Sequence, residues 1–326
     1  MANAYRLSRA LYVAAELALA DHLAAGPRSA EALAALTGAH APSLHRLMRT
    51  LASLGLFVED EAHRFALTPL GAALRSDAPG SARAAVRTLA GPAFWKAWEH
   101  TLYSVQTGKP GWPRAWGTGP FEYFAAHPDE ASRFSETMVA FHGNEPPAVA
   151  AAYDFSGAGT VVDVGGATGN LLAAILERHP DVRGILYDLP HVVREAPALL
   201  ARRGVLERVS IEAGSFFERV PHGGDAYLLS HVIHDWDEAQ CLQILGCCRR
   251  AMRAGARLLL VEMIVPPGNE PHPSKLLDLS MLVSVGGQER TEEEYRRLLQ
   301  RAGFRLLRVL PTASAVSVLE ALPAAA

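Results

Sequence analysis

The chain has 326 residues, of which 49% are hydrophobic and 20% charged, and its formal net charge at pH 7 is −3. This composition predicts a globular protein with two domains, or one large domain with an addition, and argues against disorder. The small net charge gives no general attraction to nucleic acid or to anionic membranes. No apolar run is long enough to predict a transmembrane helix.

The targeting and cysteine signals are those expected of a cytoplasmic protein. The N-terminus has no basic segment followed by an apolar core and a cleavage site, so we do not expect secretion. Cys241, Cys247 and Cys248 fall in one predicted helix with no spacing typical of zinc binding or of a disulfide framework. We expect them to be small buried residues in a reducing compartment.

The N-terminal part predicts three helices and a hairpin, which is a winged-helix pattern. Apolar residues recur at three and four over Tyr5–Ala25, and further helices are predicted over Ser29–Leu36 and Pro42–Leu54. Phe57–Asp60 and Arg64–Leu67 then form a short β-hairpin.

Two functions fit a winged helix. In a DNA-binding domain, Leu44–Leu54 would be the recognition helix, and His45, Arg46 and Arg49 would contact phosphates. Basic and acidic residues balance through residue 60, however, whereas DNA-binding domains normally have a basic face. The long apolar first helix instead favours a surface covered by a second subunit.

The middle of the chain is rich in aromatic residues. Helices are predicted over Ala82–Leu89, Phe94–Gln106, Phe121–Ala126 and Asp129–His142, with a breaker loop over Gly108–Pro113. Such a cluster suits a flat apolar or phenolic ligand, although ordinary helix packing explains each member about equally well. The predicted substrate-lining residues are Trp112, Met138, Phe141, His142, Asn144 and Met281.

The strongest local signal is Val161–Asn170, where a β-branched run ends in a carboxylate, a glycine cluster and a helix start. Glycines allow a backbone to approach a ligand closely. A second predicted strand ends at Asp188, about 25 residues after Asp163, where a carboxylate would grip a ribose diol. A dinucleotide and S-adenosylmethionine (SAM) both fit this spacing. Asp163 would repel a phosphate, which favours a cationic ligand, while a glycine turn without any ligand remains possible from this stretch alone.

Strands and helices alternate from residue 155 onward, which predicts a doubly wound sheet. The predicted strands are Thr160–Val164, Gly184–Asp188, Val209–Ala213, Ala226–His231, Arg257–Val265, Phe304–Leu310 and Ala315–Ala321. The predicted helices are Asn170–His179, His191–Arg203, Ala239–Ala254 and Thr291–Ala302. Only four residues, 311–314, join the last two strands, so this pair must be antiparallel.

Three stretches that follow or belong to these strands contain candidate functional residues. Ser215 and Phe216 follow the third strand, where an adenine would lie. His234 follows the fourth strand at the ligand edge, where a neutral imidazole can accept a proton from a phenol. Glu262 and Glu289 are predicted to accept the second N–H of His234, although Glu289 fits a salt bridge to a neighbouring arginine about equally well. His231 is expected to be structural.

A family resemblance rests on five motifs that occur in order. They are Asp163–Gly169, Tyr187–Val193, Gly214–Phe217, His234–Trp236 and Gly287–Thr291. Together they resemble the SAM-dependent O-methyltransferases of plant phenylpropanoids and flavonoids and of bacterial aromatic polyketides. Leu33–Leu56 is similar to the winged-helix dimerisation domain of that family, so the resemblance spans nearly the whole chain.

The resemblance implies a class I methyltransferase fold, an α/β Rossmann-like sheet preceded by a mostly helical winged-helix dimerisation domain. The implied parts are residues 1–90 for dimerisation, 91–150 for a helical, substrate-lining region and 151–326 for SAM binding. SAM would be the cofactor, S-adenosyl-L-homocysteine (SAH) its product, an aromatic small molecule the acceptor, and a homodimer the assembly. No metal is expected, because the sulfonium of SAM is already activated, and the charge and hydropathy of the chain predict no nucleic acid or membrane partner.

Roles follow from the same resemblance. His234 would be the general base, flanked by Glu262 and Glu289. The cofactor would be contacted by Asp163, Gly165, Gly166, Asp188, Leu189, Ser215, Phe216 and Ser230. The family usually has aspartate at Ser215, and its plant members have lysine at Ser230, so two cofactor contacts depart from the pattern.

Two other functions remain open from the sequence. Some proteins of this fold family keep SAM but act as hydroxylases, decarboxylases or cyclases. A non-enzymatic alternative is a regulator with a winged-helix domain and a ligand-binding domain. The neutral charge of the N-terminal part disfavours this alternative.

Overall fold

The computed structural model describes residues 2–324 and divides into two compact units. The N-terminal unit comprises the chain up to His100 together with Trp112–Gly143. The sheet unit comprises Thr101–Gly111 and the chain from Asn144 onward.

The N-terminal unit begins with the predicted winged-helix elements. Its first helices are α1 (Ala4–Glu16), α2 (Leu19–His22), α3 (Ala30–Thr37) and α4 (Ala41–Ser53). The prediction of one helix over Tyr5–Ala25 is wrong, because Ala18 takes a left-handed conformation (φ 51°) that separates α1 from α2. Apolar periodicity continues across this break, so the sequence pattern does not reveal it.

The hairpin and the helix ends in this unit agree with the predictions. The Ser29 side chain accepts a hydrogen bond from the Ala32 N–H (3.3 Å), and Gly38 ends α3 in the left-handed conformation. The hairpin strands are β2 (Phe57–Glu59) and β3 (Arg64–Leu67), and β1 (Arg28–Ser29) adds a third strand in the order β1-β3-β2.

The middle of the chain is helical, as expected, with shifted boundaries. The helices are α5 (Pro69–Ala72), α6 (Arg83–Leu89), α7 (Pro92–Trp98), α8 (Thr101–Thr107), α9 (Gly111–Trp116), α10 (Pro120–Ala126) and α11 (Pro128–His142). The helix predicted over Phe94–Gln106 is divided between α7 and α8. The loop predicted over Gly108–Pro113 is wrong at its end, because proline is tolerated in the first turn of a helix and Pro113 lies there in α9.

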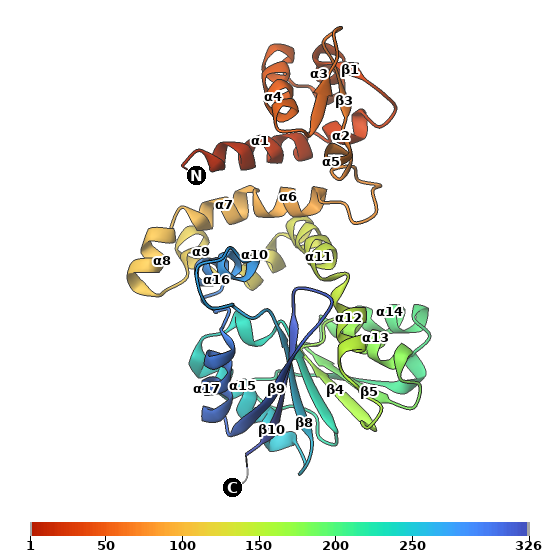
Figure 1. Cartoon of the computed structure of the whole chain (residues 1–326), viewed down its shortest axis with the longest axis vertical. Coiled ribbons are helices and arrows are strands. Elements are labelled where there is room, and N and C mark those ends of the chain that lie inside the picture. The colour runs from red at the N-terminus through yellow and green to blue at the C-terminus, as the bar shows by residue number, and fades with distance from the viewer. Residues whose placement is uncertain (1, 325–326) are drawn as a thin grey trace. The chain divides into compact units, whose positions relative to one another are not determined.

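The sheet unit contains a seven-stranded sheet in the order β6-β5-β4-β7-β8-β10-β9 (Figure 1). The strands are β4 (Thr160–Val164), β5 (Arg183–Asp188), β6 (Val209–Ala213), β7 (Ala226–Ser230), β8 (Arg257–Glu262), β9 (Phe304–Pro311) and β10 (Ser317–Pro323). The first five strands are parallel to their neighbours, whereas β10 runs antiparallel to both β8 and β9. The predicted sheet with one reversed strand near its end is confirmed.

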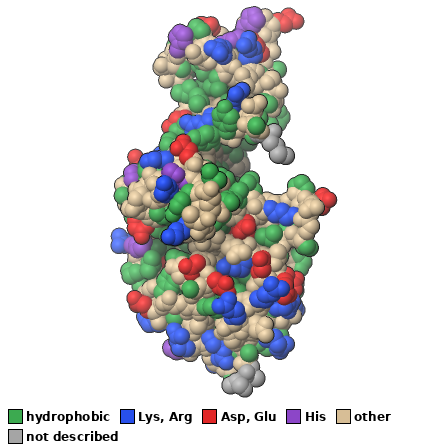
Figure 2. Space-filling view, turned by 90° about the vertical axis from the view of Figure 1, so that its left-hand side faces the viewer, with side chains coloured by type: hydrophobic (Ala, Val, Ile, Leu, Met, Phe, Trp, Pro, Cys, Tyr) green, Lys and Arg blue, Asp and Glu red, His purple; other side chains and the backbone are tan. Residues whose placement is uncertain are grey.

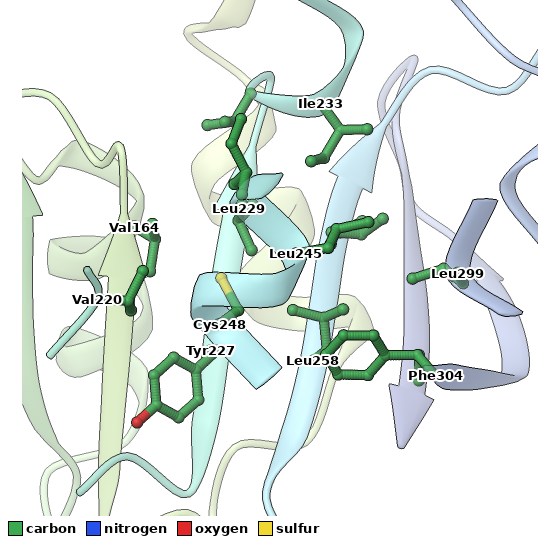
Figure 3. Close-up of a cluster of buried hydrophobic side chains, with 14 of the residues drawn as sticks. Val164, Val220, Tyr227, Leu229, Ile233, Leu245, Cys248, Leu258, Leu299 and Phe304 are labelled. Atoms are coloured by element: carbon green, nitrogen blue, oxygen red, sulfur yellow. The ribbon is translucent and has the colours of Figure 1, made fainter. Parts of the chain in front are cut away.

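Helices cover both faces of the sheet. They are α12 (Glu145–Ala152), α13 (Asn170–Arg178), α14 (Ala196–Arg202), α15 (Glu238–Ala251) and α17 (Glu292–Arg301), and the sheet unit also contains α16 (Pro273–Ser284). Alternate residues of β8 explain the two layers. Leu258 and Leu260 pack with α15 and α17, and Figure 3 shows Leu258 near Leu245 of α15. Leu259 and Val261 pack with α12, α13 and α14. Of these helices, α12 and α16 were not predicted.

Three short 3₁₀ turns complete the sheet unit: η1 (Val193–Glu195), η2 (Leu206–Arg208) and η3 (Ile233–Asp235). Acidic and basic side chains are interspersed over the face of this unit that Figure 2 shows. Within residues 2–324, no helix is long and apolar enough to cross a membrane.

Candidate active site

The glycine-rich turn joins β4 to α13 and brings backbone close to the carboxyl edge of the sheet. Gly165 (φ 72°) and Gly169 (φ 82°) take the left-handed conformation, and Gly169 caps α13. A Cβ on Gly166 would lie 2.5 Å from the carboxyl carbon of Asp163. The positive φ and the crowding together explain why this turn requires glycine at these positions.

Asp188 ends β5 beside that turn, as predicted. Its Oδ2 accepts from the Ala167 N–H (2.9 Å) and its Oδ1 from the Leu189 N–H (2.6 Å). Each carboxylate oxygen keeps a second lone pair that can accept a hydroxyl proton. Burial raises the pKa of Asp188 above its ordinary value, against the effect of these two backbone hydrogen bonds.

Asp163 lies beneath the glycine turn inside β4. Its side chain is 1% exposed, and neither carboxylate oxygen has a hydrogen-bond partner within residues 2–324. Burial, with the nearby charge of Asp188, raises the pKa of Asp163 to about 7. A buried carboxylate without a partner is costly, so this position favours a cation in the turn above it.

The residues predicted to border the adenine, Ser215 and Phe216, follow β6, and Ser230, another predicted cofactor contact, ends β7. The Ser215 hydroxyl accepts from the Phe217 N–H (3.3 Å), and the Phe216 ring would lie 3.4 Å from a Cβ on Gly165. Phe216 therefore borders the glycine turn. Ser230 ends β7, the strand next to β4 in the sheet, so it belongs to the same carboxyl edge.

His234 lies in η3, directly after β7, and is 8% exposed. Its Nδ1 is 2.6 Å from Glu289 Oε1 and 3.7 Å from Glu262 Oε2, while its Nε2 is 3.5 Å from Asp235 Oδ1. The structure therefore brings His234, Glu262 and Glu289 together, as predicted from the sequence. Asp235 was not singled out in the sequence, although it is adjacent to His234.

Two opposing effects set the proton affinity of this cluster. Burial lowers the pKa of His234, but the Glu262, Asp235 and Glu289 carboxylates overcome that effect and raise the pKa to about 10. Burial also raises the pKa of Glu262 to about 8, and the negative charge of Glu289 adds to this shift. The cluster therefore binds protons more tightly than the same residues would in water.

Backbone contacts hold η3 in place. The Ile233 N–H donates to Glu262 Oε1 (2.9 Å), and the Gln288 N–H donates to the His234 carbonyl (2.8 Å). A Cβ on Gly287 would stand 1.9 Å from the His234 carbonyl oxygen, so the two segments approach closely only because residue 287 is glycine. Figure 3 shows the Ile233 side chain in the hydrophobic core next to Leu245, in the cluster that also contains Leu258.

A second histidine–carboxylate pair lies close by and was missed. His231 has a left-handed backbone (φ 53°), and its Nε2 is 2.7 Å from Glu145 Oε2. The two imidazole centroids of His231 and His234 are 5.2 Å apart. Glu145 was missed because it begins α12, which the two prolines after it concealed.

The six predicted substrate-lining residues fall in both units. In the N-terminal unit, Trp112 is fully buried and packs against Phe94 (5.1 Å between ring centroids) and Tyr123 (5.5 Å). Met138 and His142 are half-buried on α11, and Phe141 is 54% exposed. Asn144 and Met281 belong to the sheet unit, where Asn144 precedes α12 and Met281 lies in α16. Their contact with a substrate stays a prediction.

Comparisons with known proteins give a consistent result over nearly the whole chain. A family model described as an O-methyltransferase domain matches residues 98–305, and one described as an O-methyltransferase dimerisation domain matches residues 1–77. The phenazine O-methyltransferase PhzM of Lysobacter antibioticus is 46% identical over 323 residues, which cover 99% of this chain and 94% of the relative.

Solved structures are similar as well. The mitomycin 7-O-methyltransferase MmcR superposes with a TM-score of 0.92 at 40% identity, covering 99% of this chain and 95% of that one. An O-methyltransferase from neocarzinostatin biosynthesis, in complex with SAM and 2-hydroxy-5-methyl naphthoic acid, has a TM-score of 0.87 at 34% identity. That match covers 97% of this chain and 96% of the other.

Proposed function

The chain belongs to the O-methyltransferase family, and we propose that it methylates a hydroxyl group of an aromatic small molecule with His234 as the general base. The enzyme is a SAM-dependent O-methyltransferase by family. Family membership gives the reaction class, whereas the base and the aromatic acceptor are proposed. The observation that carries it is the 2.6 Å contact between His234 Nδ1 and Glu289 Oε1 at the carboxyl edge of the sheet.

The residues of the glycine turn fit SAM. Gly165 and Gly166 would admit the methionine portion, Asp188 would accept hydrogen bonds from the ribose hydroxyls, and Leu189, Ser215, Phe216 and Ser230 would border the remainder. The unpartnered, buried Asp163 suits a cationic ligand. When bound, SAM supplies an electrophilic methyl group on a sulfonium cation, whose positive charge also opposes protonation of His234.

His234 takes the proton of the acceptor hydroxyl through Nε2. Glu289 accepts the Nδ1 hydrogen, which fixes the tautomer with a lone pair on Nε2 and stabilises the imidazolium that forms. Glu262 stabilises the same cation from 3.7 Å. Base catalysis of this kind contributes about 10²- to 10⁴-fold, and alignment of the oxygen with the methyl group contributes the rest.

Three further expectations belong to the proposal. Trp112, Met138, Phe141, His142, Asn144 and Met281 are proposed to shape the acceptor pocket. The chain is proposed to act in the cytoplasm as a homodimer in bacterial specialised metabolism. The exposed side chains of Tyr5 (51%), Leu7 (45%) and Val13 (36%) on α1 support an N-terminal dimer contact.

The test combines binding with turnover. Calorimetry measures the affinity for SAM and SAH, and mass spectrometry follows incubation with SAM and a panel of phenols, hydroxynaphthoates and aromatic amines. The proposal predicts a gain of one methyl group on a phenolic oxygen. Methylation confined to amines contradicts the hydroxyl acceptor. If an aromatic compound is converted without gaining a methyl group, the result supports the alternative that this chain binds SAM but has lost methyl transfer.

A further inference from the structure

The Arg290 guanidinium lies between the two segments that carry the base and its carboxylate partner. Arg290 is only 4% exposed and directly follows Glu289. Its Nη1 donates to the Ile233 carbonyl (3.2 Å) and to the Gln288 carbonyl (3.0 Å). These carbonyls belong to the residues immediately before His234 and Glu289, so one nitrogen ties both segments together.

Other contacts hold Arg290 itself in place. Its Nη2 is 3.7 Å from Cys241 Sγ, and its guanidinium carbon is 5.9 Å from the Tyr295 ring centroid. The Arg290 carbonyl accepts from the Val265 N–H (3.0 Å), which joins this segment to the chain that follows β8. Arg290 is therefore fixed at both its backbone and its side chain.

The peptide groups beside His234 have their partners from three elements. The Ile233 N–H bonds to Glu262 of β8, the Ile233 carbonyl accepts from Cys241 Sγ of α15 (3.2 Å) and from Arg290, and the His234 carbonyl accepts from the Gln288 N–H. Of these contacts, only the one from Arg290 reaches the backbone of both the His234 segment and the Glu289 segment through a single side chain.

We propose that Arg290 is a positioning residue that sets the distance between His234 and Glu289 by binding the carbonyl groups that precede both. It does not touch the reacting atoms. A short hydrogen bond between His234 and Glu289 depends on that distance, and misplacement of a reacting group by about 1 Å can cost about a hundredfold in rate. The inference rests on the proposed role of His234 in catalysis, but the positioning itself has a readout that does not require turnover.

The variants are Arg290→Met, Arg290→Lys and Arg208→Met. Methionine keeps the unbranched stem but removes the charge and the donors, whereas lysine keeps a cation that can still donate to carbonyls. Arg208 is a matched control, because its guanidinium also donates to backbone carbonyls, those of Leu176, His179, Pro180 and Val182, at a place remote in the chain from His234.

Proton NMR reads the positioning directly. The Nδ1 proton of His234 in its 2.6 Å hydrogen bond is expected far downfield, and the resonance is assigned by its loss in His234→Ala. Arg290→Met should lose or markedly shift this resonance and lower kcat at least tenfold, with less than a threefold change in the Kd for SAM. Arg290→Lys should recover part of the downfield resonance and part of kcat. Arg208→Met should leave the resonance and kcat as in the wild type.

Each outcome decides between the claims. An unchanged resonance and a kcat within twofold of the wild type in Arg290→Met overturn the inference. If Arg290→Met does not fold, Arg290→Lys is measured alone, and a resonance and kcat identical to the wild type overturn it equally. If His234→Ala keeps full methyl transfer, the proposed base fails, while the effect of Arg290 variants on the downfield resonance still tests the positioning.

Discussion

His234 and Glu289 are 55 positions apart in the chain, yet the His234 Nδ1 and Glu289 Oε1 atoms lie 2.6 Å apart. This pairing fixes which imidazole nitrogen remains available to an acceptor. It also explains why a histidine surrounded by Asp235, Glu262 and Glu289 holds a proton more tightly than usual.

The pH dependence of methyl transfer should reflect a raised pKa at His234. Protonated imidazole cannot accept a proton, so kcat/KM should increase with pH as His234 deprotonates, with a midpoint above its ordinary value of 6.5. Glu289→Gln removes one of the three carboxylates that raise the pKa of His234, whereas those of Asp235 and Glu262 remain. The increase should therefore occur at lower pH in Glu289→Gln, with a lower maximum rate, and an unmoved profile would contradict the assignment.

Asp163 should make cofactor binding depend on pH. Its pKa is about 7, so the carboxylate ionises between pH 6 and pH 8 and then attracts a cationic ligand. The Kd for SAM, measured by calorimetry, should decrease over this range in the wild type. In Asp163→Asn the Kd for SAM should change much less over the same pH range. An equal pH dependence of Kd in the two proteins would exclude Asp163 as its cause.

Asp188→Ala should weaken SAM binding and leave the fold intact. The variant loses hydrogen bonds to a charged group, worth about 1.5–3 kcal/mol, which corresponds to about a ten- to hundredfold rise in Kd. It also frees the Ala167 N–H that Asp188 holds in the glycine turn. Asp181→Ala, on the exposed loop before β5, serves as a control, and equal Kd values in the two variants would rule out the ribose contact.

Gly287→Ala should lower both the melting temperature and methyl transfer. An added Cβ would meet the His234 carbonyl oxygen at 1.9 Å, so the η3 segment must move. Gly246→Ala is the matched control within α15, where the nearest atom to an added Cβ is Arg250 Nη1 at 3.5 Å. Calorimetry should show Gly246→Ala to be more stable by about 0.5–1 kcal/mol. A melting temperature equal to the wild type in Gly287→Ala would contradict the close approach.

The sheet and the cluster around His234 could be predicted from sequence because their signals are local and their geometry is general. Strands β4 to β8 end in residues that parallel pairing must gather at one edge, so His234, Asp188 and Ser215 could be placed near one another. That argument gives the shared edge of the sheet but no distance between side chains. It therefore left Glu289 open between a salt bridge at a helix start and a contact with His234.

The sequence analysis missed features that leave no recognisable local pattern of residues. Ala18 adopts a left-handed conformation that no periodicity reveals, and α12 begins with Glu145 followed by two prolines that read as a breaker. The Arg290 contacts go to backbone carbonyls, which every residue has, so the sequence contains no sign of them.

The most direct test of the central claim is methyl transfer by His234→Ala, measured by mass spectrometry beside calorimetric SAM binding. His222→Ala is the control, since its imidazole lies in the same unit and bonds to the Ala251 carbonyl. We predict that His234→Ala binds SAM within about threefold of the wild type but loses about 10²- to 10⁴-fold in kcat, while His222→Ala keeps its activity. A His234→Ala variant that binds SAM and methylates a phenol at the wild-type rate would contradict His234 as the general base.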